Sequence, residues 1–198
     1  MRWNIPNILT VARLIAAPGV AVMFLYFNRP WADWCALVLF MGAALTDWFD
    51  GYLARLWRQQ TKIGTMLDPI ADKAMVVIAL AVILGYSPMS PWLVLPATLI
   101  LFREVFVSGL REYLGDVAGT LKVTNLAKWK TTVQMVAIAV LFSQGVFEHY
   151  QITTPHDWIA TGMVWSGRIG LALLWLAAAL TAITGWDYFR KALPHLKE

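Results

Sequence analysis

Residues 74–102 read AMVVIALAVILGYSPMSPWLVLPATLILF and contain no charged side chain. A helix needs about 20 mostly apolar residues to cross a lipid bilayer, and this run is long enough for more than one crossing. Gly85, Pro88 and Pro91 interrupt it, and glycine and proline at such positions end helices. The stretch therefore predicts two consecutive membrane-spanning helices, and with them an all-helical membrane protein.

The composition of the whole chain supports this fold class. Of its 198 residues, 59% are hydrophobic and 14% are charged, whereas a soluble domain carries roughly 25% charged residues. Too few charged side chains remain for a water-facing surface, which excludes an ordinary soluble enzyme, a disordered segment and a nucleic-acid-binding module. The single cysteine, Cys35, excludes an intramolecular disulfide framework and a cysteine-based zinc site.

Apolar segments along the chain predict six membrane spans, and no linker separates a second domain. Residues 1–198 are therefore expected to form a single membrane domain. The spans are predicted near residues 7–27, 33–55, 65–86, 91–111, 131–148 and 160–186.

Basic residues predict the orientation of these spans. With six spans, both termini lie on one side of the membrane. Of the 16 lysines and arginines, all but Arg29 and Arg168 lie on that side or at the helix ends that face it. Basic residues accumulate on the cytoplasmic side, so both termini are expected in the cytoplasm. Arg168 lies within the last span, where it should point inward or extend to the membrane interface.

Aspartates are concentrated in two neighbouring segments, residues 46–55 and 64–73. At about 100° per residue, one helix face of the first segment carries Asp47, Asp50, Gly51, Ala54 and Arg55. Asp68 and Asp72 are four residues apart and share a face of the second helix. The polar connection between the segments is short, which predicts antiparallel neighbouring helices and four converging carboxylates.

Four carboxylates this close cannot all stay ionised without compensation, so either some are protonated or cations bind them. Oxygen ligands without histidine or cysteine favour Mg²⁺ or Mn²⁺, and two such ions suit phosphoryl chemistry. Gly51 would let a ligand approach the backbone, and Arg55 would neutralise a phosphate. Alternatively, the aspartates form a proton or ion pathway, Gly51 serves helix packing, and Arg55 is a topology signal.

The acidic motif resembles the signature of the CDP-alcohol phosphatidyltransferases. It reads Asp47-x2-Asp50-Gly51-x2-Ala54-Arg55-x8-Gly64-x3-Asp68-x3-Asp72. The resemblance implies six transmembrane helices, a homodimer, and an enzyme that uses a divalent metal to displace CMP from a CDP-linked lipid with an alcohol. It also implies roles for single residues: Asp47, Asp50 and Asp68 as metal ligands, Asp72 as ligand and general base, and Gly51, Ala54 and Arg55 beside the CDP moiety.

Basic residues near the fourth and fifth spans bear on the acceptor alcohol. Arg103 and Arg111 are eight residues apart, about 80° around a helix, and Lys128, Lys130 and Thr131 begin the fifth span. Together they predict a basic patch for an anionic acceptor such as a sugar or glycerol phosphate. Alternatively, these cations are topology signals, with Glu104 and Glu112 as local partners.

The acceptor-side residues, together with Asn4–Thr10 and Arg13, resemble family members that use CDP-diacylglycerol and sn-glycerol 3-phosphate. Such an enzyme is expected in the inner, cytoplasmic membrane with its active site facing the cytoplasm. Asn7 and Thr10 either face the nucleotide or serve helix entry. Rival interpretations are another acceptor (inositol phosphate, serine or a phospholipid) and a cation or proton transporter. A transporter is disfavoured because the aspartates cluster at one membrane face with arginine and glycine.

Overall fold

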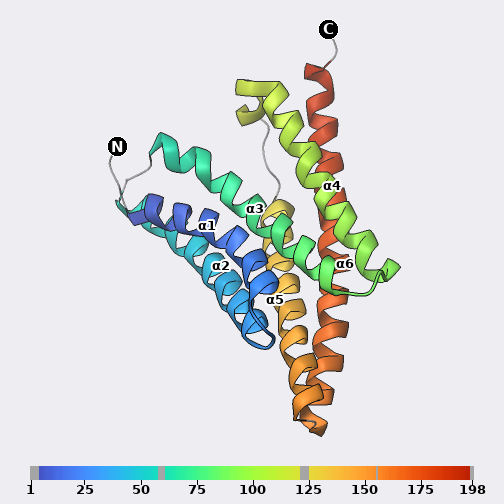
Figure 1. The fold of residues 1–198 in the computed structure, drawn as a ribbon. Helices are drawn as coiled ribbons and strands as arrows, with labels where there is room; N and C mark the ends of the chain where they lie inside the picture. The colour runs from blue at the N-terminus through green and yellow to red at the C-terminus, as the bar shows by residue number, and fades with distance from the viewer. Residues whose placement is uncertain (1–4, 58–60, 121–124, 155, 197–198) are drawn as a thin grey trace. The chain divides into compact units, whose positions relative to one another are not determined.

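A computed structural model describes residues 5–57, 61–120, 125–154 and 156–196 of the chain. Six long helices and two short 3-10 helices account for almost all of them (Figure 1), and the described residues include no strand. The helices are α1 (Ile5–Tyr26), α2 (Trp31–Trp57), α3 (Lys62–Tyr86), α4 (Pro91–Leu114), η1 (Gly115–Thr120), α5 (Asn125–Thr153), α6 (Asp157–Ala192) and η2 (Leu193–His195). The predicted all-helical fold with six long helices is confirmed.

Four stretches of the described residues are long and apolar enough to cross a membrane, namely Asn7–Tyr26, Pro91–Leu114, Trp129–Thr153 and Asp157–His195. In α2 the stretch Trp31–Thr46 is apolar, and the side chains that follow it are outside the described part of the structure. The described part of α3 includes Asp68, Asp72 and Lys73 within the helix. The chain is thus a multi-pass membrane protein.

The long apolar run is broken where the sequence predicts. Helix α3 ends at Tyr86, and the backbone N–H of its C-cap residue Ser87 bonds to the Ile83 carbonyl. Helix α4 then begins at Pro91, because the first helical position needs no N–H donor and tolerates the fixed φ of proline.

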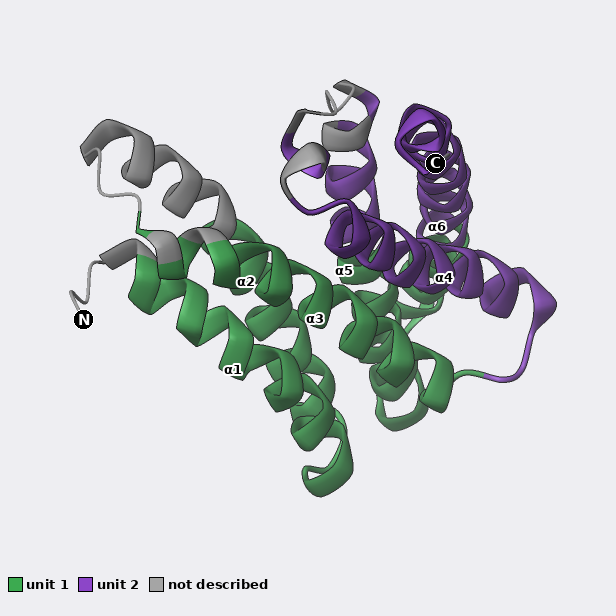
Figure 2. Ribbon diagram, turned by 90° about the horizontal axis from the view of Figure 1, so that it is seen from above, with its two compact units in different colours: residues 1–87, 138–168 green, residues 88–137, 169–198 purple. Residues whose placement is uncertain are grey.

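The helices form two compact units (Figure 2). Unit 1 comprises residues 1–87 and 138–168, and unit 2 comprises residues 88–137 and 169–198. In unit 1, α1 packs against both α2 and α3. Its core includes an aromatic cluster in which the Phe142 ring lies 6.0 Å from Phe24 and 5.9 Å from Phe40.

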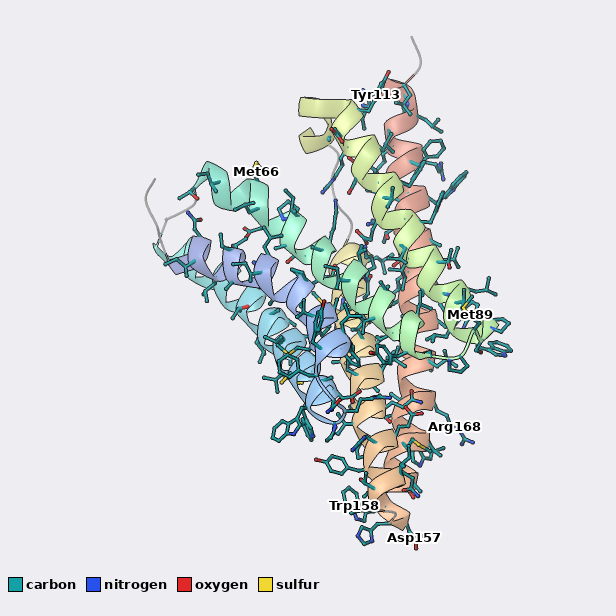
Figure 3. The ribbon with its side chains drawn as sticks, viewed as in Figure 1. Met66, Met89, Tyr113, Asp157, Trp158 and Arg168 are labelled. Carbon is teal, nitrogen blue, oxygen red and sulfur yellow. The ribbon has the colours of Figure 1, made fainter. Side chains whose placement is uncertain are left out.

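Two further features of unit 1 lie away from the acidic motif. Arg29, between α1 and α2, makes a double hydrogen bond to the buried Asp33 at 2.7 and 2.8 Å. This hydrogen bonding raises the pKa of Arg29. Arg168 on α6 is exposed and extends away from the helix (Figure 3).

Unit 2 consists of α4, the beginning of α5 and the later part of α6. Small and branched side chains such as Ala97, Ile100 and Leu174 are fully buried in it. The Trp175 indole N–H donates to the Trp92 carbonyl at 2.9 Å, which joins α6 to the first turn of α4. This packing sets the positions from which α4 and α6 present their polar residues.

Candidate active site

The part of the acidic motif that lies on α3 is in close contact with α1. The Thr61 hydroxyl caps α3 by accepting the Gly64 N–H at 3.1 Å, and it donates to Asn7 Oδ1 at 2.8 Å. A Cβ atom on Gly64 would lie only 2.6 Å from the same Asn7 oxygen. An added side chain here would therefore force the Asn7 side chain to shift from its hydrogen bond with Thr61.

One turn further along α3, Asp68 and Asp72 lie on the same helix face and both contact Arg13 of α1. Arg13 Nη1 donates to Asp72 Oδ1 at 2.7 Å, and Nη2 donates to Asp68 Oδ1 at 3.3 Å. The Thr10 hydroxyl donates to the same Asp68 oxygen at 2.6 Å. Because both carboxylates contact the same guanidinium, the two aspartates share one face of α3, as their spacing predicts.

Burial differs sharply between the partners in this group. The Arg13 side chain is 3% exposed, whereas those of Asp68 and Asp72 are 48% and 34% exposed. The guanidinium thus supports the carboxylates from within the helix packing, and the carboxylates remain accessible to a ligand.

The other half of the acidic motif lies at the end of α2, where the side chains of residues 47–57 are outside the described part of the structure. This applies to Asp47, Asp50, Gly51, Ala54 and Arg55. The described side chains include no group of three or more His, Cys, Asp or Glu residues that could hold a metal. Convergence of all four carboxylates therefore stays a prediction.

Sequence reasoning missed the role of Arg13, which it treated as a topology signal and as part of the resemblance. Asn7, Thr10 and Arg13 are spaced three residues apart in an otherwise apolar helix, and such spacing places them on one face. That polar stripe was the available signal. All three are at most 8% exposed, and Asn7 and Thr10 contact residues at the start of α3.

In unit 2, Glu104 of α4 contacts two of the predicted acceptor-binding cations. Lys130 Nζ forms an ion pair with Glu104 Oε1, and Arg103 Nη1 lies 3.4 Å from the same oxygen. All three side chains are at most 17% exposed. The sequence interpretation of Glu104 as a local partner of Arg103 is right but incomplete, because Lys130 comes from α5.

Helix α6 completes the surroundings of Arg103. Arg103 Nη2 lies 3.5 Å from the Thr184 hydroxyl. A Cβ atom on Gly185 would lie 2.9 Å from Arg103 Cγ, so glycine at this position makes room for the arginine side chain.

The remaining predicted acceptor residues are Arg111, Lys128 and Thr131. Arg111 is exposed, with its guanidinium carbon 5.6 Å from the centre of the Tyr188 ring. Thr131 is exposed on α5, and the Lys128 side chain is outside the described part. The structure thus brings Arg103 and Lys130 together around one carboxylate and leaves Arg111 at the surface.

A sequence model of the CDP-alcohol phosphatidyltransferase family matches residues 3–183. The chain therefore belongs to the CDP-alcohol phosphatidyltransferases, and it is an enzyme of this class. Three relatives carry the name CDP-diacylglycerol–glycerol-3-phosphate 3-phosphatidyltransferase. That of Cereibacter sphaeroides is 63% identical over 100% of this chain and 99% of its own length. That of Rickettsia bellii is 40% identical over 94% of each chain, and that of Escherichia coli K12 is 37% identical over 97% of this chain and 96% of its own.

Proposed function

We propose that this enzyme transfers the phosphatidyl group from CDP-diacylglycerol to sn-glycerol 3-phosphate and releases CMP. The single observation that carries the chemistry is the pair of accessible carboxylates, Asp68 and Asp72, ordered by Thr10 and Arg13. The choice of acceptor is supported by the names of relatives that match the full length of the chain.

The donor set at this position suits a divalent metal. Asp68 and Asp72 offer carboxylate oxygens one helical turn apart, and such hard ligands suit Mg²⁺ or Mn²⁺. We assign Asp47, Asp50, Asp68 and Asp72 as the residues that hold two ions. When bound, these ions would neutralise the charge that develops on the pyrophosphate during transfer.

The protein's own residues then carry the proton and the substrates. The Asp72 carboxylate accepts the proton of the acceptor hydroxyl, because a neutral alcohol is a poor nucleophile. The alcohol oxygen forms a bond to the phosphorus that bears diacylglycerol, and the bond from that phosphorus to the CMP oxygen breaks. The CDP moiety lies against Gly51, Ala54 and Arg55, with Asn7 and Thr10 nearby.

The acceptor phosphate binds to the cations of unit 2, namely Arg103, Arg111, Lys128 and Lys130, with Thr131 as an additional donor. Arg103 and Lys130 both contact Glu104, so this buried group presents two cations beside one carboxylate. Glu104 acts as a positioning residue, because it holds the two cations side by side.

Topology and assembly follow from the distribution of basic residues and from the family resemblance. We place the enzyme in the inner membrane as a homodimer, with both termini and the active site facing the cytoplasm. A water-soluble nucleotide and a phosphorylated acceptor then reach the site from the cytosol, while the acyl chains stay in the bilayer.

The reaction is tested by measuring CMP release from CDP-diacylglycerol by the purified enzyme in detergent. The acceptors are sn-glycerol 3-phosphate, inositol phosphate, serine and a phospholipid, each with Mg²⁺, with Mn²⁺ and with a chelator. We expect release with sn-glycerol 3-phosphate and a divalent metal, and loss of release with the chelator. Faster release with another acceptor would overturn the assigned acceptor, and release unaffected by the chelator would overturn the metal assignment.

A further inference from the structure

Arg13 contacts both carboxylates of the α3 pair, and it lies almost completely buried. A guanidinium stays protonated in proteins and presents several donors in a fixed plane. In this structure two of its nitrogens donate hydrogen bonds to the Oδ1 atoms of two different aspartates. Arg13 is therefore placed as a counterion for the pair.

A divalent cation and the Arg13 guanidinium can both bind to these carboxylate oxygens. Two carboxylates one turn apart repel each other unless a positive charge lies nearby, and either cation supplies it. The two cations also repel each other at short range. Full binding of one therefore weakens the contacts of the other.

The two arginine contacts differ in length, which indicates where exchange begins. The contact with Asp72 is 2.7 Å, whereas that with Asp68 is 3.3 Å. Asp68 also has the Thr10 hydroxyl at 2.6 Å, so its carboxylate keeps an orienting hydrogen bond when the longer contact is lost.

From this geometry we propose that Arg13 is the internal counterion of the acidic site and that a divalent cation binds by displacing the guanidinium from Asp68. The inference rests on the proposed metal-dependent function. Arg13 acts as a positioning residue in this scheme: it holds the carboxylates together before the metal binds and competes with the metal for them.

Direct Mn²⁺ binding tests the exchange without any turnover. The purified full-length enzyme in detergent, without substrates, is titrated with Mn²⁺, and free Mn²⁺ is measured by its electron paramagnetic resonance signal. We expect Arg13→Gln to lower the Kd for Mn²⁺ about 10-fold or more, because the competing cation is gone. An arginine with a purely structural role predicts the opposite, since losing it would misplace the carboxylates and weaken Mn²⁺ binding.

A charge-conserving variant separates competition from simple charge repulsion. Lysine keeps the positive charge but is a single point donor and does not span two carboxylates as the planar guanidinium does. We expect Arg13→Lys to bind Mn²⁺ more tightly than the wild type and less tightly than Arg13→Gln. Binding equal to or weaker than wild type in Arg13→Lys would overturn the exchange, and this variant decides the test if Arg13→Gln fails to fold.

Arg29→Gln is the matched control, because it removes another arginine that is hydrogen-bonded to an aspartate, Asp33, outside the acidic site. Its Kd for Mn²⁺ should equal that of the wild type. A wild-type enzyme without saturable Mn²⁺ binding would overturn the proposed metal site and the exchange together. Saturable wild-type binding with weaker binding in both Arg13 variants would overturn the exchange alone.

Discussion

Each unit contains a group of contacting charged side chains, and the ratio of cations to carboxylates is opposite in the two groups. In unit 1, one arginine, Arg13, contacts two carboxylates. In unit 2, one carboxylate, Glu104, contacts two cations, Arg103 and Lys130. Among the contacts of the described residues, the first group has one cation for two carboxylates, and the second has two cations for one carboxylate.

Under the proposed function the two groups suit different ligands. The accessible carboxylates beside Arg13 suit a divalent cation, and the two cations beside Glu104 suit an anionic phosphate. Exposure supports the first assignment, because the aspartates are the accessible members of their group. The comparison predicts that substitutions in the group around Arg13 impair the reaction step. Substitutions in the group around Glu104 should impair acceptor binding.

The largest effect is expected at Asp72. Asp72→Asn preserves the shape of the side chain but cannot accept the acceptor's proton, and general-base catalysis typically contributes 10²- to 10⁴-fold. We expect kcat to fall about 1,000-fold, with metal and nucleotide binding kept better than in Asp50→Asn. CMP release and CDP binding are the measurements.

Asp157→Asn is the control for this change, since Asp157 is an exposed carboxylate at the start of α6 (Figure 3). Its kcat should stay at the wild-type value. Undiminished turnover in Asp72→Asn would remove the assignment of Asp72 as the base.

The next effect is expected in unit 2, on acceptor binding. Lys130→Gln removes one of the two cations on Glu104, and a hydrogen bond to a charged group contributes about 1.5–3 kcal/mol. We expect the KM for sn-glycerol 3-phosphate to rise about 10- to 100-fold, and the KM for CDP-diacylglycerol to change far less. Steady-state kinetics with each substrate varied in turn provide both values.

Lys191→Gln is a suitable control, because Lys191 also pairs with a carboxylate, Asp187, but is more exposed. Neither KM should change in this variant. A rise in the lipid KM alone for Lys130→Gln would show that the group around Glu104 does not bind the acceptor.

The sequence predicts the helices well but only part of each charged group. The apolar runs and the Gly85–Pro91 break locate the six helices, since membrane spans depend on local composition and length. The position of Asp68 and Asp72 on one helix face follows from their spacing. Arg13 and Lys130 reach their carboxylates across long sequence separations, from 26 to 59 residues. Helix periodicity contains no information on which helices pack together, so these contacts needed the structure.

A smaller effect, mainly on stability, is expected where α1 meets α3. Gly64→Ala would place a Cβ atom 2.6 Å from Asn7 Oδ1, and overpacking of this kind costs about 1–3 kcal/mol. We expect the Tm to fall by about 5 °C, together with a loss of activity as the helix bearing Thr10 and Arg13 shifts away from the aspartates. Thermal unfolding in detergent measures the first and CMP release the second.

Gly42→Ala on α2 provides the comparison, because an added Cβ there meets nothing within 4 Å. Alanine is the better helix former, so this variant should be as stable as the wild type or slightly more stable. Equal Tm values for the Gly64→Ala and Gly42→Ala variants would show that the close contact of α1 with α3 is not needed.

The smallest effect is expected at Arg111, which sharpens the comparison within unit 2. Arg111 is exposed and its guanidinium lies 5.6 Å from the centre of the Tyr188 ring, an interaction that contributes about 0.5–1 kcal/mol at exposed sites. An exposed cation also interacts weakly with a phosphate, because water and salt screen it. Arg111→Gln should therefore raise the KM for sn-glycerol 3-phosphate about 2- to 5-fold, less than Lys130→Gln, and the increase should shrink at high salt. An effect of Arg111→Gln as large as that of Lys130→Gln would mean that burial with Glu104 is not what makes a cation effective in acceptor binding.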